Sequence, residues 1–193
     1  MKRFLLAAVA GLAATLLIST PSDARIEIDP VSGRAMEQLN TGRGGYSPIP
    51  RQVVEYETRH RAGTIIIDTE ERRLYLVMED GKALKYGVGV GRPGFEWAGT
   101  HRVTRMAEWP GWTPPAAMRR RQPGLPAFVP GGPNNPLGAR ALYLGSTLYR
   151  IHGSNEPWSI GQAVSSGCIR MTNEDVMDLY NRVRVGAKVV VVR

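Results

Sequence analysis

The feature that most constrains the fold is a series of short β-branched runs, separated by turn residues, that begins at Gly63. Residues 64–68, 74–78 and 83–90 form the first three runs, and residues 79–82 supply turn chemistry between the second and the third. In the third run, apolar residues alternate with Lys85, Gly87 and Gly89, which is the period of a strand with one buried face. This pattern predicts a β-meander and a mainly β domain.

Further apolar runs later in the chain also predict strands. Strands are expected at residues 101–106, 141–144, 148–152 and 188–192, and the last is nearly all valine, which predicts burial on both faces. The run Thr172-Asn173-Glu174-Asp175, with an oxygen-bearing cap and acidic residues in the first turn, predicts a helix start, and Gly186 is expected to end that helix. Residues 34–39 have the composition of a single helical turn. The expected fold class is therefore mainly β with one or two short helices.

A proline-rich segment interrupts the strands at residues 109–138. It holds eight of the fourteen prolines, so neither a helix nor a central strand is expected there. Connections of this length are uncommon in compact domains unless they serve as lids or binding loops. Because Trp109, Trp112, Phe128 and Leu137 would be poorly used in a disordered loop, we expect a packed lid over a groove. An irregular surface loop without function is the alternative.

The first two dozen residues have the composition of a secretory signal peptide. A basic pair, Lys2 and Arg3, precedes an apolar run over residues 4–18, and small residues end at Ala24. The run is shorter than the ~20 residues of a membrane span, although an uncleaved anchor is the alternative. We expect a signal peptide over 1–24, a linker or extended segment over 25–60, and one compact domain over 61–193. The protein is then exported to the periplasm or cell envelope, with no stable membrane insertion.

The formal net charge of +8 falls to +7 when the predicted signal peptide is removed, so the mature chain is itself basic. A basic exported protein favours anionic partners such as cell-wall polymers. No zinc-finger or RNA-recognition signature accompanies the charge, so nucleic acid is not expected as a partner.

Cys168 is the one cysteine of the chain, and it follows His152 by sixteen residues. A leftover cysteine in an exported protein cannot form an intramolecular disulfide, so a reactive thiol is one explanation. A thiol of ordinary pKa, ~8.5, is mostly protonated near neutrality and needs a base. His152, at the end of a predicted strand, is the candidate base. A buried structural cysteine is the competing interpretation.

The residues around Cys168 add candidate partners. Gly167 allows a tight turn whose N–H groups, with that of Cys168, point toward an oxyanion. Ser165 and Ser166 add hydroxyl donors, and Arg170 is expected to hold a substrate carboxylate or to brace the loop. One cysteine and three widely spaced histidines lack the spacing of metal ligands, so neither a metal nor another cofactor is expected.

These motifs resemble the L,D-transpeptidases with a YkuD-type catalytic domain. The family pattern of His-Gly, a gap of this size, and Ser-x-Gly-Cys-(Ile/Val)-(Arg/Asn) matches His152-Gly153 and residues 165–170. Residues 130–142 and 149–157 also resemble the proteobacterial envelope branch, and the resemblance covers about 60–193. It implies a β-sandwich or barrel-like fold with a long lid loop, no cofactor, and acylation of Cys168 by carbapenems.

The resemblance also implies a reaction. The cysteine attacks the bond between the diamino acid at position three and D-Ala at position four of a peptidoglycan stem, releases D-Ala, and passes the acyl group from a thioester to an amine. That amine belongs to another stem peptide or to a lysine of an outer-membrane protein. Cys168 is then the nucleophile, His152 the base and acid, and the Gly153 carbonyl the group that orients the imidazole.

Two positions depart from the family pattern. Ser166 stands where many members have histidine, and residues 97–100 replace an upstream Thr-Pro-x-Gly-Thr segment. Three alternatives stay open: an L,D-carboxypeptidase that transfers to water, a non-catalytic peptidoglycan-binding envelope protein, and an envelope lipid or nucleic-acid binder driven by charge.

Overall fold

The computed structural model describes residues 27–28, 35–36 and 47–193. The chain divides into two units, Met1–Leu39 and Asn40–Arg193. In the first unit β1 (Glu27–Ile28) pairs antiparallel with β2 (Ala35–Met36). The helical turn predicted for 34–39 is therefore wrong at residues 35–36, which take part in strand pairing. The predicted signal peptide over 1–24 lies outside the described residues.

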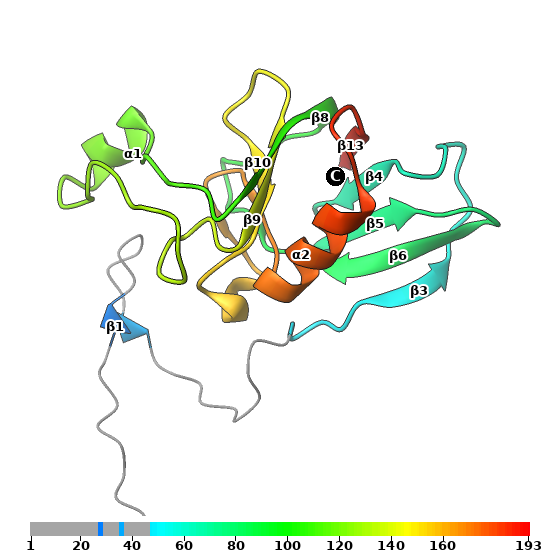
Figure 1. The fold of residues 1–193 in the computed structure, drawn as a ribbon, viewed down its shortest axis with the longest axis horizontal. Coiled ribbons are helices and arrows are strands. Elements are labelled where there is room, and N and C mark those ends of the chain that lie inside the picture. Colours follow the sequence, from blue (N-terminus) through cyan, green and yellow to red (C-terminus); the bar gives the residue numbers. More distant parts are fainter. Residues whose placement is uncertain (1–26, 29–34, 37–46) are drawn as a thin grey trace, which may run out of the picture. The chain divides into compact units, whose positions relative to one another are not determined.

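Nine strands of the second unit form one sheet, in the order β12-β10-β9-β8-β13-β4-β5-β6-β3. Figure 1 shows this sheet curving around the core, with helix α2 against it. The meander predicted from Gly63 onward is confirmed and forms neighbouring antiparallel strands. The bounds are β3 (Gln52–Glu55), β4 (Ile65–Asp68), β5 (Arg73–Val77), β6 (Lys82–Gly87), β8 (Gly99–Glu108), β9 (Arg140–Leu144), β10 (Arg150–His152), β12 (Ile169–Arg170) and β13 (Lys188–Val192).

The sheet closes on itself near the end of the third predicted run. That run is not one strand, because it bends after β6 and continues as β7 (Val90–Gly91), which pairs in parallel with β11 (Ala163–Ser165). In the bend between β6 and β7, Gly89 exchanges two backbone hydrogen bonds of 2.9 and 2.8 Å with Arg170. A side chain at Gly89 would overlap the Ser159 carbonyl. This contact joins β12, at one end of the sheet, to the segment that follows β6 near its other end.

β13 lies inside the sheet, parallel to β4 and antiparallel to β8. Val189 and Val191 are buried, whereas Val190 and Val192 are more accessible. The expectation of burial on both faces is therefore wrong: this central strand has one face in the core.

Helix α2 (Asn173–Arg182) begins as predicted. The Thr172 hydroxyl accepts a hydrogen bond from Asp175 N at 3.2 Å, and acidic residues occupy the first turn. The helix ends at Arg182, four residues before Gly186, so the predicted end is wrong. Gly186 instead has φ +95° in the turn before β13, where its N–H donates to the Val103 carbonyl. The apolar face of α2 packs on β9 and β10.

The domain also includes residues upstream of 61. β3 extends the sheet at its β6 edge, and the Arg51 guanidinium contacts the Asp175 carboxylate of α2 at 3.2 Å. Ile49 fills the space over Gly87, where a Cβ would overlap it. These contacts fix residues 49–55 to the domain, although their short polar sequence carries no strand pattern of its own.

The proline-rich segment contains one helix, α1 (Ala116–Arg121), so the expectation of no helix there is wrong. It follows Pro114 and Pro115, which fits the preference of proline for a helix start. Trp112 and Leu137 are buried, as expected for a packed segment, but Trp109 and Phe128 are 42% and 58% exposed. The guanidinium of Arg121 lies 5.5 Å from the Phe95 ring centre, so this segment contacts the loop after β7.

Candidate active site

Two parallel strands bring the predicted catalytic residues together. β10 and β12 pair in a register that places Ile151 beside Ile169 and His152 beside Arg170. Cys168 directly precedes β12 and therefore lies next to Arg150. Because successive side chains alternate between faces, Arg150, His152, Cys168 and Arg170 share one face. Ile151 and Ile169 lie on the other face, in the core.

The Cys168 thiol is partly exposed, and its Sγ lies 3.7 Å from the Leu148 carbonyl. Burial raises the pKa of this thiol, whereas the neighbouring positive charge of Arg150 acts to lower it. The thiol is therefore neutral near pH 7 and needs a base at the moment of attack.

His152 is buried, and its Nδ1 lies 2.5 Å from the carbonyl oxygen of Gly153. A carbonyl oxygen accepts hydrogen bonds, so Nδ1 carries the proton and Nε2 keeps its lone pair. Burial, together with the charges of Arg170 and Arg150, lowers the pKa of His152 to about 3. The imidazole is then neutral, in the tautomer that a general base requires.

Gly153 has a steric reason to be glycine. A Cβ at this position would lie 2.3 Å from Asn173 Oδ1 and 3.0 Å from Ala139 N. Asn173 Oδ1 accepts a hydrogen bond from Ala139 N at 2.8 Å, which ties the start of α2 to the end of the proline-rich segment. The strand that carries His152 therefore ends in a closely packed corner. Asn173 was expected only as a helix-start residue, and this contact has no local sequence signal.

The turn before Cys168 is held by Ser165. Its Oγ accepts from Gly167 N at 3.1 Å and donates to the Cys168 carbonyl at 2.6 Å. Both groups are thus used inside the turn, and the roles of the Gly167 N–H as an oxyanion donor and of Ser165 as a substrate donor stay predictions that this arrangement does not favour. Ser166 Oγ lies 3.4 Å from Arg92 Nη1 and is partly exposed.

Two aromatic residues that were not predicted support this turn. Trp97 Nε1 donates to the Gly167 carbonyl at 2.6 Å, and its ring stacks on Tyr149 at 4.4 Å between centroids. Gly167 has φ +102°, and a Cβ there would lie 2.5 Å from the Tyr149 ring. Only glycine fits this combination of backbone conformation and contact. The sequence predicted Tyr149 only as part of a strand over 148–152. Trp97 was named only within residues 97–100, which depart from the family pattern.

The side chain of Arg170 is buried in the domain. Its guanidinium forms a buried salt bridge with Glu156, and its backbone pairs with Gly89. Of the two predicted roles of Arg170, this geometry favours that of a brace for the loop over that of a partner for a substrate carboxylate. The sequence predicted no role for Glu156 beyond its place in the family-like segment 149–157, because nothing in its local pattern indicates a partner fourteen residues away.

Replacing Glu156 by Gln should lower the free energy of unfolding by about 3–5 kcal/mol, because it leaves the Arg170 charge buried without its counter-ion. Chemical denaturation at pH 7 measures this change. The matched control is Glu108→Gln, since Glu108 is 62% exposed in its salt bridge with Arg140 and should contribute about 1 kcal/mol or less. Equal losses in the two variants would contradict the buried pair.

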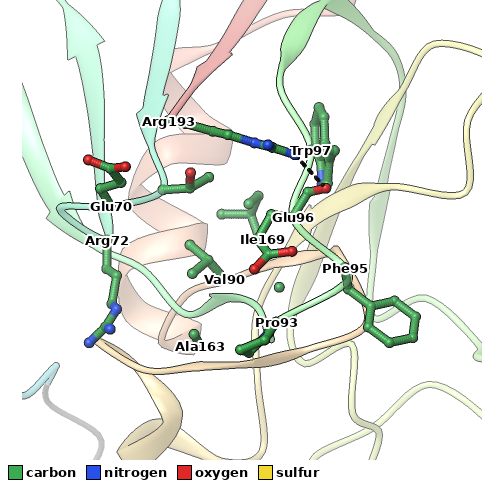
Figure 2. Close-up of a pocket in the computed structure, with 12 residues that line it drawn as sticks. Glu70, Arg72, Val90, Pro93, Phe95, Glu96, Trp97, Ala163, Ile169 and Arg193 are labelled. Carbon is green, nitrogen blue, oxygen red and sulfur yellow. Dashed lines mark hydrogen bonds between the residues drawn. The ribbon is translucent and has the colours of Figure 1, made fainter.

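A cavity of about 440 Å³ lies on the other face of β12. Figure 2 shows Val90, Ala163 and Ile169 at its centre, with Glu70 and Arg72 on one side and Phe95 on the other. Neither Cys168 nor His152 lines it. Among the described residues, no three His, Cys, Asp or Glu side chains cluster as a metal site would need. Within the same residues, no helix has the length and apolar character to cross a membrane.

The chain matches known proteins over most of the described domain. The L,D-transpeptidase catalytic domain, YkuD, matches residues 62–191. The Escherichia coli proteins Probable L,D-transpeptidase ErfK/SrfK and Probable L,D-transpeptidase YbiS are 39% and 40% identical, over 77% and 73% of this chain. These matches cover 49% and 47% of the two relatives, so the chain spans about half of their length.

Solved structures agree on the fold. A Brucella melitensis protein, named a probable carnitine operon oxidoreductase caia, is 44% identical with a TM-score of 0.51, over 76% of this chain and 96% of that chain. L,D-transpeptidase 3 from Mycobacterium tuberculosis has a TM-score of 0.52 at 17% identity, over 67% and 60%, and shows the fold alone. The YkuD match over residues 62–191 and the two E. coli relatives show that the chain belongs to the L,D-transpeptidase family of enzymes.

Proposed function

We propose that this enzyme transfers acyl groups between peptidoglycan stem peptides with Cys168 as its nucleophile. The observation that carries the proposal is the shared face of β10 and β12, which holds Cys168 beside a buried, neutral His152 whose Nδ1 faces the Gly153 carbonyl. A thiol and a base on one face are what acyl transfer through a covalent intermediate requires. The basic net charge of +8 supports an anionic wall substrate.

The proposed reaction has two halves. Cys168 Sγ attacks the carbonyl between the diamino acid and D-Ala, and the thiol proton passes to His152 Nε2. The tetrahedral intermediate collapses as His152 returns that proton to the leaving nitrogen, so D-Ala departs and a thioester remains. An acceptor amine then attacks the thioester, gives its proton to His152, and releases the Cys168 sulfur, which recovers the proton. The amine belongs to a second stem peptide or to a lysine of an outer-membrane protein.

The Cys168 N–H is our candidate for stabilising the oxyanion, because the Gly167 N–H is bound to Ser165. Trp97 would act on it indirectly by holding the Gly167 carbonyl, which belongs to the same peptide unit as the Cys168 N–H. Without that hydrogen bond the peptide unit is free to rotate. Trp97 is then a positioning residue for the oxyanion site.

Trp97→Phe should slow acylation of Cys168 about 10-fold, because it keeps an aromatic ring against Tyr149 but removes the N–H donor. Acylation by the tetrapeptide is followed by mass spectrometry. Alkylation by iodoacetamide needs no oxyanion site, so its rate should not change. Equal slowing of both reactions would assign Trp97 a general structural role instead.

Export to the cell envelope stays a prediction from residues 1–24, which lie outside the described residues. Secretion of the full chain with cleavage after Ala24, measured by the mass of the mature N-terminus, supports it. Retention of the intact chain inside the cell would contradict it.

The function itself is tested by incubating the purified protein with disaccharide-tetrapeptide and recording mass spectra of both protein and products. An acyl adduct on Cys168 together with a cross-linked dimer supports the transpeptidase. Tripeptide without dimer would indicate an L,D-carboxypeptidase, in which water replaces the amine. Binding without any new product would contradict catalysis and indicate a peptidoglycan-binding protein.

A further inference from the structure

A row of residues crosses four strands and ends at the Cys168 thiol. In the strand register, Arg105 of β8 lies opposite Tyr143 of β9, and Tyr143 lies opposite Arg150 of β10. The next step across is Cys168, because Ile151 pairs with Ile169 in the following row. Residues in one row of a sheet share a face. The row therefore places two cations in line with the candidate nucleophile.

Tyr143 holds both guanidinium groups. The central carbon of the Arg105 guanidinium lies 3.5 Å from the centre of the Tyr143 ring, and that of Arg150 lies 5.2 Å from it. Stacking on an aromatic ring restrains a guanidinium but leaves the N–H groups at its edge free to bind an anion. The Tyr143 ring lies between the two strands that carry these arginines, and Arg150 is the arginine on the Cys168 side.

The charges of these two arginines are not neutralised by carboxylates. Within residues 47–193 the salt bridges involve Arg51, Arg140, Arg170 and Arg182, and neither Arg105 nor Arg150 takes part in one. Arg150 Nη1 donates to the Leu148 carbonyl at 3.2 Å, while its Nε is buried with no hydrogen-bond partner in this part of the chain. A buried N–H without a partner is uncommon, and the Arg150 side chain also lies within hydrogen-bonding reach of the Cys168 thiol, so Arg150 presents its donors to the reacting group.

We infer that Arg150 forms a carboxylate-binding subsite beside Cys168, which holds the C-terminal carboxylate of the donor peptide, and that Arg105, on the far side of Tyr143, adds a more distant positive charge to it. This inference rests on the proposed function for the identity of that peptide. In a tetrapeptide cleaved before its last residue, the free carboxylate lies one residue beyond the attacked carbonyl, or roughly 3.5 Å along an extended chain. Arg150 is the neighbour of Cys168 across the strand pair, so its distance fits. Arg170 is excluded from this role by its salt bridge with Glu156.

The subsite gives a physical reason for acting at the end of a stem. A peptide that ends at the fourth residue brings its carboxylate to the Arg150 guanidinium, with the charge of Arg105 farther along the row. A longer peptide places a neutral amide there and leaves the buried Arg150 donor without an anionic acceptor. Charge-assisted hydrogen bonds of this kind are the strong ones in protein recognition. The two arginines would therefore select tetrapeptide donors by their terminal charge.

A pair of small alkylating agents tests the subsite without any peptidoglycan chemistry. Iodoacetate carries a carboxylate and iodoacetamide a neutral amide, and both need the same thiolate, so the ratio of their rates at Cys168 cancels changes in the thiol pKa. Arg150→Met should lower the iodoacetate to iodoacetamide ratio about 10-fold or more. The control Arg184→Met removes an exposed charge in the turn between α2 and β13 and should leave the ratio unchanged.

Arg105→Met provides a second variant that does not disturb a buried group, because Arg105 is exposed. It should lower the same ratio about 2- to 5-fold, as expected for a more solvated charge. An unchanged ratio in both variants would overturn the subsite.

The donor specificity is tested with a tetrapeptide and its C-terminal amide. The wild-type enzyme should prefer the acid, and Arg150→Met should reduce that preference about 10-fold or more in kcat/KM. Equal losses on both peptides would overturn the assignment to the terminal carboxylate, because they indicate an effect on the thiol alone. If neither peptide is turned over, the proposed function fails, while the alkylation ratio still decides whether the subsite exists.

Discussion

Cys168→Ala is expected to abolish turnover, with a loss on the order of 10⁴-fold or more, while leaving binding to peptidoglycan largely intact. The thiol is the nucleophile of the proposed mechanism, whereas docking depends on the rest of the face and on the basic surface. Product formation from disaccharide-tetrapeptide measures the first quantity, and sedimentation with insoluble peptidoglycan measures the second.

Cys168→Ser sharpens this test because it keeps a hydroxyl of similar size in the same turn. The hydroxyl of serine is a much weaker acid than a thiol, and burial already raises the pKa of the group at this position, so the serine variant should also be inactive. Ser146→Ala, in the exposed turn between β9 and β10, serves as a control that should retain full turnover. Activity of either Cys168 variant near the wild-type level would exclude the nucleophile.

The strands that sequence patterns predicted are those with a local signal. The β-branched run of β4 and the meander into β6 have period-two patterning and turn residues, so both elements were predicted. β3 has no such pattern, because it is an exposed edge strand stabilised by pairing with β6 and by the Ile49 contact over Gly87. Its position depends on tertiary contacts that single-sequence patterns do not contain.

The same distinction applies to the candidate site. That His152 and Cys168 act together was expected from the motif spacing and from the strand end at His152, whereas β12 and its parallel pairing with β10 were not predicted. The salt bridge from Arg170 to Glu156 and the hydrogen bond from Trp97 to Gly167 depend on which loops meet in the folded domain. The predicted carboxylate partner Arg170 is an instance of this limit, because its sequence position is close to Cys168 but its side chain is directed to Glu156.

His152→Asn should lower turnover by about 10²- to 10⁴-fold, the usual contribution of a general base. Asparagine retains an N–H that can donate to the Gly153 carbonyl, as His152 Nδ1 does, but it has no basic nitrogen in place of Nε2. The loss should appear in kcat, since the imidazole acts on the proton in transit. A loss confined to KM would contradict the role of His152 as a base.

The low pKa of His152 gives this variant a second signature, in stability. The unfolded chain takes up a proton at this histidine near pH 6.5, but the folded protein does so only near pH 3. Between these two pH values the unfolded state binds more protons than the folded state. The contribution of His152 to the free energy of unfolding therefore falls as the pH drops. The slope approaches about 1.4 kcal/mol per pH unit.

Asparagine at position 152 does not titrate, so His152→Asn should lose less stability than the wild-type protein between pH 6.5 and pH 4. Chemical denaturation across this range measures both proteins, and their difference cancels the shared titration of the carboxylates. Parallel curves would show that His152 keeps an ordinary pKa and takes up its proton near pH 6.5 in the folded state as well. The same measurement then bears on catalysis, because the histidine can accept the Cys168 proton near neutral pH only if it is neutral before attack.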